Sequence, residues 1–149
     1  MTIAAMSDVL TTIRSYSKAV EGVLIYHEDK TPDPEARACL ERAVERERRL
    51  QHTVDEKALS LSRRMRHVLF RSHYPRDLHS TVAAVRLAPI DDVDEVAKLV
   101  ATCDSALLHY YDTLLSSTQS VEVREFLTSM RETRDSELKQ HVWQASRGA

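Results

Sequence analysis

The chain has 149 residues, of which 42% are apolar and 30% are charged, and its formal net charge is −2. This balance is typical of a globular domain with its own hydrophobic core, and it argues against a disordered tail. A slightly negative chain also gives no reason to expect non-specific binding to nucleic acids or to a membrane surface.

The N-terminal sequence MTIAAMSDVLTT lacks a basic region followed by a long apolar run, so no signal peptide is predicted. No apolar run approaches the ~18 residues of a membrane span. Cys39 and Cys103 lack the spacing of a metal-binding pair and lie in helix-like segments, which indicates buried thiols in a reducing compartment. A cytoplasmic location is therefore predicted.

The chain contains few helix breakers, with two glycines and four prolines, and β-branched alternation is absent. This pattern favours long helices over strands. In chain order, the expected helices cover about 7–29, 34–73, 91–117 and 120–146. Asp33 can cap the second helix, and Pro34 fits the first helical position. Acidic residues near Asp91 suit the first turn of the third helix.

Short connections within each pair of helices predict antiparallel hairpins over 7–73 and 91–146, joined by a longer crossover over 74–90. The predicted fold is a single all-α domain, 1–149, built as a ferritin-like four-helix bundle. A helix over 34–73 would be ~60 Å long at 1.5 Å per residue, which is longer than its partners. We therefore expect an overhang or a break in its C-terminal third.

Each predicted helix brings an ionisable side chain to or near its apolar stripe. Glu47 and Asp104 are central in the stripes of the second and third helices. Arg134 follows the stripe of the fourth helix, about level with Asp104 when both are counted from the shared loop. Because a lone buried charge is costly, the sequence predicts a buried charge layer of Glu47, Asp104 and Arg134.

A metal site remains an alternative interpretation of the same interior positions. Bundle di-metal sites combine inward carboxylates with a Glu-x-x-His pattern on two helices. This chain departs from that pattern, since Arg49 precedes His52 by three positions and Leu138 precedes His141. Carboxylates and imidazoles would suit iron, manganese or zinc. The candidate ligands are Glu21, Glu47, Asp104, Glu137 and His141, with His27 in reserve.

The segments VEGVLIYHEDKTPDPEARACLERAVERERRLQ and CDSALLHYYDTLLSSTQSVEVREFLTSM carry a resemblance to a known family. Together they resemble a bacterial family of ferritin-like four-helix-bundle proteins, known as a domain of unknown function. The resemblance covers about residues 8–145 and implies a ferritin-like bundle, but no established reaction. The matching positions are Glu21, Gly22, Asp33, Pro34, Glu35, Ala101, Cys103, Asp104, Tyr111, Leu114, Leu115, Val121, Val123, Arg124 and Leu127.

The segment 62–76, SRRMRHVLFRSHYPR, is rich in arginine and contains no acidic residue. It could bind phosphate groups, or it could be a solvated helix face; the negative net charge and the absence of a nucleic-acid-binding motif favour the second interpretation. Its apolar residues would be exposed beyond the reach of the hairpin partner, and such a patch usually marks an interface. The predicted interface residues are Met65, Val68, Leu69 and Phe70.

No serine lies in a Gly-x-Ser-x-Gly turn, and no glycine-rich phosphate loop is present, so no catalytic residue is assigned. The sequence predicts a helical-bundle protein without catalytic activity that acts through self-association, with a dimer favoured, or through a protein partner. The alternative function is a metal-binding bundle of carboxylates and histidines with oxidase-like or storage-like activity.

Overall fold

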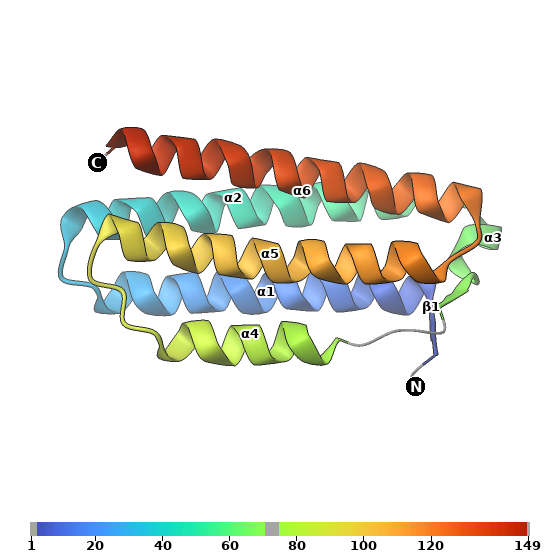
Figure 1. The fold of residues 1–149 in the computed structure, drawn as a ribbon, viewed down its shortest axis with the longest axis horizontal. Helices are drawn as coiled ribbons and strands as arrows, with labels where there is room; N and C mark the ends of the chain where they lie inside the picture. The colour runs from blue at the N-terminus through green and yellow to red at the C-terminus, as the bar shows by residue number, and fades with distance from the viewer. Residues whose placement is uncertain (1–2, 71–74, 149) are drawn as a thin grey trace.

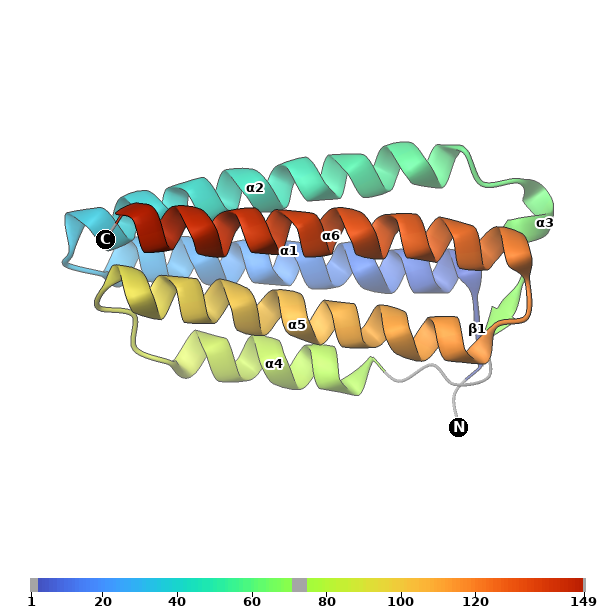
Figure 2. The same cartoon turned by 45° about the horizontal axis from the view of Figure 1, so that its top comes forward.

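In this computed structural model, residues 3–70 and 75–148 are described, with side chains up to residue 140, and they are almost entirely helical. The long helices lie side by side as a bundle (Figures 1 and 2). They are α1 (Met6–Lys30), α2 (Pro34–Leu59), α5 (Val93–Ser117) and α6 (Val121–Gly148). Within the described residues, none of the helices is long and apolar enough to cross a membrane.

Side-chain caps fix where two of these helices begin. The Asp33 carboxylate accepts a hydrogen bond from the backbone N–H of Glu35 at 3.3 Å, with Pro34 at the first helical position of α2. The Asp92 carboxylate likewise accepts from the backbone N–H of Glu95 at 2.8 Å at the start of α5. Both helices therefore begin within two residues of the predicted positions.

The second helix ends at Leu59, not near residue 73, so the predicted hairpin over 7–73 is shorter than expected. The Ser60 hydroxyl donates to the backbone carbonyl of Lys57 at 2.6 Å, and the Ser62 hydroxyl accepts from the backbone N–H of Met65 at 3.2 Å. Serine hydroxyls compete for backbone groups in this way and favour helix ends. The result is a break, followed by the single-turn helix α3 (Arg63–Arg66).

The structure contains a short antiparallel pairing that the sequence did not predict. Strand β1 (Ala4–Ala5) pairs with β2 (Leu69–Phe70), and the backbone N–H of Met6 donates to the carbonyl of Val68 at 2.9 Å. This pairing folds the segment after α3 back onto the bundle. Phe70 is consequently 0% exposed.

The four residues predicted to form an interface therefore differ in their exposure to solvent. The assignment of Phe70 to this interface is wrong, because that side chain lies in the core. Met65 and Val68 are half-buried and pack against the same core. Only Leu69, which is 61% exposed, remains available on the surface.

The crossover contains a helix of its own. Helix α4 (Arg76–Leu87) packs against α1 and α5 and runs back along the length of the bundle (Figures 1 and 2). It returns the chain to the end where α2 begins, so α2 and α5 point in the same direction. Leu78 and Val85 bury one face of α4, and His27 on α1 contacts the backbone carbonyl of Val85 through Nε2 at 2.8 Å.

Candidate functional site

The middle of the bundle buries charged side chains from α2, α5 and α6. Arg46, Glu47, Asp104 and Arg134 are each at most 5% exposed. We call these residues the charge layer. A buried charge is tolerated only where partners compensate the loss of water, so the contacts within the layer determine its role.

One half of the charge layer is a bidentate pair between α2 and α6. The Arg134 guanidinium donates from Nη2 to Oε1 of Glu47 at 2.9 Å, and from Nη1 to Oε2 at 3.1 Å. The hydroxyl of Ser17 on α1 donates to the same Oε1 at 2.5 Å. The Glu47 carboxylate is thus held by donors from the first and last long helices.

The other half joins α2 to α5. The Arg46 guanidinium donates to the Asp104 carboxylate, and Nη1 of Arg134 lies 3.4 Å from Oδ1 of the same carboxylate. Nε of Arg46 lies 3.8 Å from Oε2 of the half-buried Glu137 and makes no hydrogen bond. The two guanidinium groups therefore balance the charges of Glu47 and Asp104 in a connected network.

The surroundings act on each carboxyl pKa in opposite directions. Burial raises the pKa of Glu47, but the charge and hydrogen bonds of Arg134 and the hydrogen bond from Ser17 outweigh it, so the net pKa lies below the usual value. For Asp104, burial outweighs the attraction of Arg134 and Arg46, and its pKa is raised. For Arg134, burial lowers the pKa, but the charges of Glu47 and Asp104 raise it by more. The net pKa lies above the usual value, so the guanidinium remains charged.

Buried phenol and thiol groups surround the charge layer. The Tyr16 hydroxyl donates to the backbone carbonyl of Cys103 at 2.6 Å. Burial raises the pKa of the Cys103 thiol to about 12, and the neighbouring Asp104 adds to the shift. Burial also raises the pKa of Tyr111 to about 12. These groups are neutral at physiological pH, and a thiol that remains protonated is a poor nucleophile.

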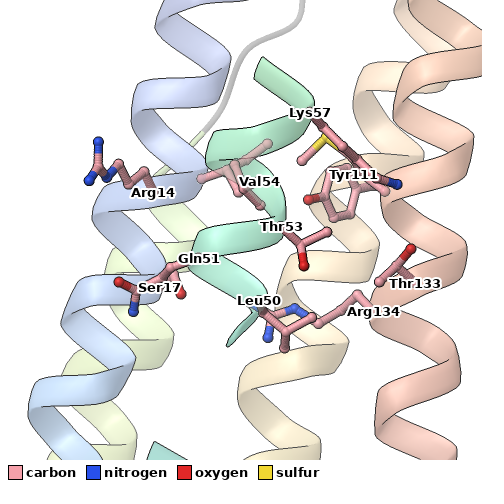
Figure 3. A pocket seen from close by; sticks show the side chains of 12 residues that line it. Arg14, Ser17, Leu50, Gln51, Thr53, Val54, Lys57, Tyr111, Thr133 and Arg134 are labelled. Carbon is pink, nitrogen blue, oxygen red and sulfur yellow. The ribbon is translucent and has the colours of Figure 1, made fainter. Parts of the chain in front are cut away.

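A narrow cleft leads towards the charge layer between the long helices (Figure 3). Arg134 reaches into it from α6, Tyr111 from α5 and Ser17 from α1, whereas Arg14 points away. The space inside it that is open to water is about 20 Å³. That volume holds about one water molecule, so the cleft in this conformation does not accommodate an organic substrate.

Two of the proposed metal ligands, Glu21 and His27, have partners outside the charge layer. Glu21 accepts from Gln51 Nε2 at 3.1 Å and lies 3.6 Å from Nε of Arg48, at the edge of the bundle. The reserve ligand His27 is engaged with α4, as described above. The side chain of His141 lies outside the described residues.

Glu47 and Asp104 are brought together, and Glu137 lies nearby, but arginine side chains lie among them. In the described part of the chain, no group of three or more histidine, cysteine, aspartate or glutamate side chains could hold a metal ion. A cation at the charge layer would meet two guanidinium groups that stay charged. Each of the two carboxylates in the charge layer therefore already has an arginine partner.

Sequence reasoning missed Arg46 and Ser17, although both carry a signal. Arg46 continues a row of apolar residues on a second face of α2, which the structure buries together with it: Ala36, Cys39, Ala43 and Leu50. Ser17 falls on the stripe between Ile13 and Val20 of α1, where a small hydroxyl interrupts larger apolar side chains. In both cases the polar residue lies at a helical spacing from buried neighbours.

Comparisons of the chain with protein-family models, with curated proteins and with solved structures found no match.

Proposed function

We propose that the chain is a ferritin-like helical-bundle protein without catalytic activity, located in the cytoplasm. In this proposal, arginine–carboxylate pairs stabilise the interior, and the protein acts by associating with copies of itself or with another protein. The observation that carries the proposal is the bidentate contact of Arg134 with Glu47, together with the contact of Arg46 with Asp104.

The physical argument concerns charge. Carboxylate groups that gather inside a helix bundle repel one another, and a bound metal ion is the usual source of the compensating positive charge. Here two fixed guanidinium groups supply that charge, and each already donates to a carboxylate. A divalent ion would have to displace these donors and leave them buried without partners, which is costly. The support for a metal-independent interior is therefore the presence of Arg46 and Arg134.

The exposed surface supports a role in association. The cleft above the charge layer holds about one water molecule, and Ser17 and Arg134 in its wall already donate to Glu47. Large apolar side chains, in contrast, are exposed on the surface, including Leu59 and Leu69. Exposed apolar residues that gather in a patch mark interaction sites, including contacts between proteins.

The test is elemental analysis of protein purified without a histidine tag, combined with its melting temperature in added iron, manganese or zinc. We expect far less than one metal ion per chain and an unchanged melting temperature. If the free ion concentration is 100 times the dissociation constant, binding adds about 2.7 kcal/mol to the stability of the fold. The melting temperature would then rise by several degrees.

The control is Glu47→Gln, which removes the central candidate ligand. One or two metal ions per wild-type chain, absent from Glu47→Gln, would contradict the proposal and favour the metal-binding alternative. A metal content that is equal in both proteins would instead indicate binding elsewhere on the surface.

A further inference from the structure

The two ends of the bundle differ in charge. At one end α2 stops, α3 and β2 follow, and α6 begins (Figures 1 and 2). Arg63, Arg64 and Arg66 of α3 are exposed there and form no ion pair with any residue that the structure describes. Unpaired, exposed arginines create a positive potential that favours an acidic surface.

Large apolar side chains accompany these arginines. Leu59 at the end of α2 is 81% exposed, Leu69 in β2 is 61% exposed and Val121 at the start of α6 is 67% exposed. We call this set of residues the basic end: Leu59, Arg63, Arg64, Arg66, Leu69 and Val121. A combination of apolar residues and arginine is the composition that protein interfaces favour.

Among the side chains that the structure describes, the opposite end is acidic. There α1 and α4 stop, and α2 and α5 begin (Figures 1 and 2). Asp29, Asp91 and Asp94 are exposed and form no ion pair within the described part of the chain, and Leu87 of α4 is 85% exposed. We call these four residues the acidic end. Asp33 and Asp92 add negative charge at this end while they cap their helices.

Three residues of the opposite sign, Lys30, Arg86 and Asp8, have local contacts. At the acidic end, the cations Lys30 and Arg86 lie over the Tyr26 ring, 5.2 and 5.0 Å from its centroid. At the basic end, the Asp8 carboxylate accepts from the backbone N–H of Ala5 at 3.1 Å, and Glu122 occupies the first turn of α6. A cation over an aromatic ring and an acidic residue in the first turn of a helix are both favourable local arrangements.

Within one chain, the two ends cannot neutralise each other. The 25 residues of α1 separate them by roughly 37 Å at 1.5 Å per residue. Screening at physiological ionic strength limits charge interactions to ~8 Å. A direct ion pair between the basic end and the acidic end would therefore join two molecules.

We infer that copies of this chain associate end to end, with the basic end of one copy on the acidic end of the next. The inference rests on the proposed function, because it names a second copy as the partner. A second copy offers an acidic surface to Arg63, Arg64 and Arg66, and it offers Leu87 to the exposed aliphatic residues. A phosphate polymer would match the arginines alone. Such a head-to-tail contact can repeat, and it forms rings or open chains rather than a closed twofold dimer.

The first test is sedimentation velocity of the wild-type chain at about 0.03 M and about 0.5 M salt, over which the Debye length falls several-fold. Association that grows with concentration at low salt and weakens at high salt is expected. A wild-type chain that stays monomeric at low salt overturns the inference. The proposed function is judged separately, because the metal content of the same preparation does not depend on association.

The second test uses neutralised ends. The basic-end variant carries Arg63→Gln, Arg64→Gln and Arg66→Gln, and the acidic-end variant carries Asp29→Asn, Asp91→Asn and Asp94→Asn. Loss of the charge pairs should lower the association constant of each variant roughly 3- to 100-fold. The matched control carries Glu45→Gln and Arg49→Gln, exposed positions in the middle of α2, and should associate like the wild type.

Mixing the two neutralised variants gives the sharpest result. Each retains one intact end, so the mixture should form a 1:1 complex with close to the wild-type association constant, while each variant alone associates more weakly. Circular dichroism establishes that both variants are folded. Association that survives both neutralisations, or a mixture that remains monomeric, overturns the end-to-end contact.

Discussion

Arg46 and Arg48 lie two positions apart on α2, yet their surroundings give them different energetic roles. Arg46 is buried against Asp104, whereas the side chain of Arg48 is 59% exposed and lies 3.6 Å from Glu21. Removing one partner of a buried pair leaves the other charge uncompensated, while an exposed pair contributes little. The two residues therefore form a matched comparison.

We expect Arg46→Met to lower the free energy of unfolding by about 3–5 kcal/mol and Arg48→Met to lower it by less than about 1 kcal/mol. Urea unfolding followed by circular dichroism measures both values. Equal losses in the two variants would show that Asp104 does not depend on Arg46 for its charge compensation.

The lowered pKa of Glu47 predicts a defined pH dependence. A carboxyl whose pKa is lower in the folded state than its usual value of 4.5 stabilises the fold above that pH, and the stabilisation is lost as the pH falls through the folded-state pKa. The wild type should therefore be more stable than Glu47→Gln at pH 7, and this difference should shrink at acidic pH. Asp104, whose pKa is raised, is present in both proteins and largely cancels from the comparison.

Unfolding free energies of wild type and Glu47→Gln, measured from pH 7 to pH 3, check this expectation. Glu56→Gln serves as the control, because the side chain of Glu56 is 66% exposed and lies in an exposed pair with His52. A difference between wild type and Glu47→Gln that stays constant down to pH 3 would indicate an unperturbed carboxyl.

At the scale of the element, helix starts were more predictable than the connection between α2 and α5. Asp33 and Asp92 cap their helices through local contacts, and local contacts can be read from neighbouring residues. The burial of Phe70 depends on pairing with β1, more than 60 positions earlier in the chain. No local pattern specifies such a contact. For the same reason, α4 was assigned to a crossover without a defined position in the bundle.

His27 determines how α4 is attached to the bundle. Its Nε2 lies 2.8 Å from the carbonyl oxygen of Val85, one of the last carbonyls of α4, which have no partner within the helix. The substitution His27→Phe keeps an aromatic ring at this position but removes the Nε2 hydrogen-bond donor. Since a hydrogen bond contributes ~0.5–1.5 kcal/mol, amide hydrogen exchange in α4 should accelerate about 2- to 10-fold.

Hydrogen exchange measured by mass spectrometry should show this acceleration in α4, with α6 unchanged. The control is Tyr26→Phe, which alters the adjacent residue without removing the bond to Val85. Equal acceleration in both variants would assign the effect to ring packing and not to the hydrogen bond.

At the scale of the molecule, the sequence was sufficient for the all-helical class and for the inward positions of Glu47, Asp104 and Arg134, because apolar stripes define them. It was insufficient to predict which arginine pairs with which carboxylate. Glu47 accepts from Arg134, while Asp104 takes Arg46 as its closer partner. A rotation of one residue about a helix axis turns a side chain by 100°, so helical periodicity cannot distinguish these partners. Only the packing of α2 against α5 and α6 determines them.

The charge layer also explains how the hairpin halves are held in register. Glu47 on α2 receives hydrogen bonds from Ser17 in its own hairpin and from Arg134 in the other. Sliding one hairpin along the other by a helical turn, ~5.4 Å, would separate these donors from their acceptor. Buried charged groups can specify a unique packing in this way even where they add little stability.

The central claim is that Glu47 and Arg134 compensate each other inside the bundle without a metal ion. A double-mutant cycle of Glu47→Leu and Arg134→Met, measured by urea unfolding in the presence of a metal chelator, tests it most directly. Each single variant should lose about 3–5 kcal/mol, and the double variant should lose less than their sum by about 2 kcal/mol or more. Losses that add to within about 0.5 kcal/mol, or a wild type that the chelator itself destabilises, would contradict the claim.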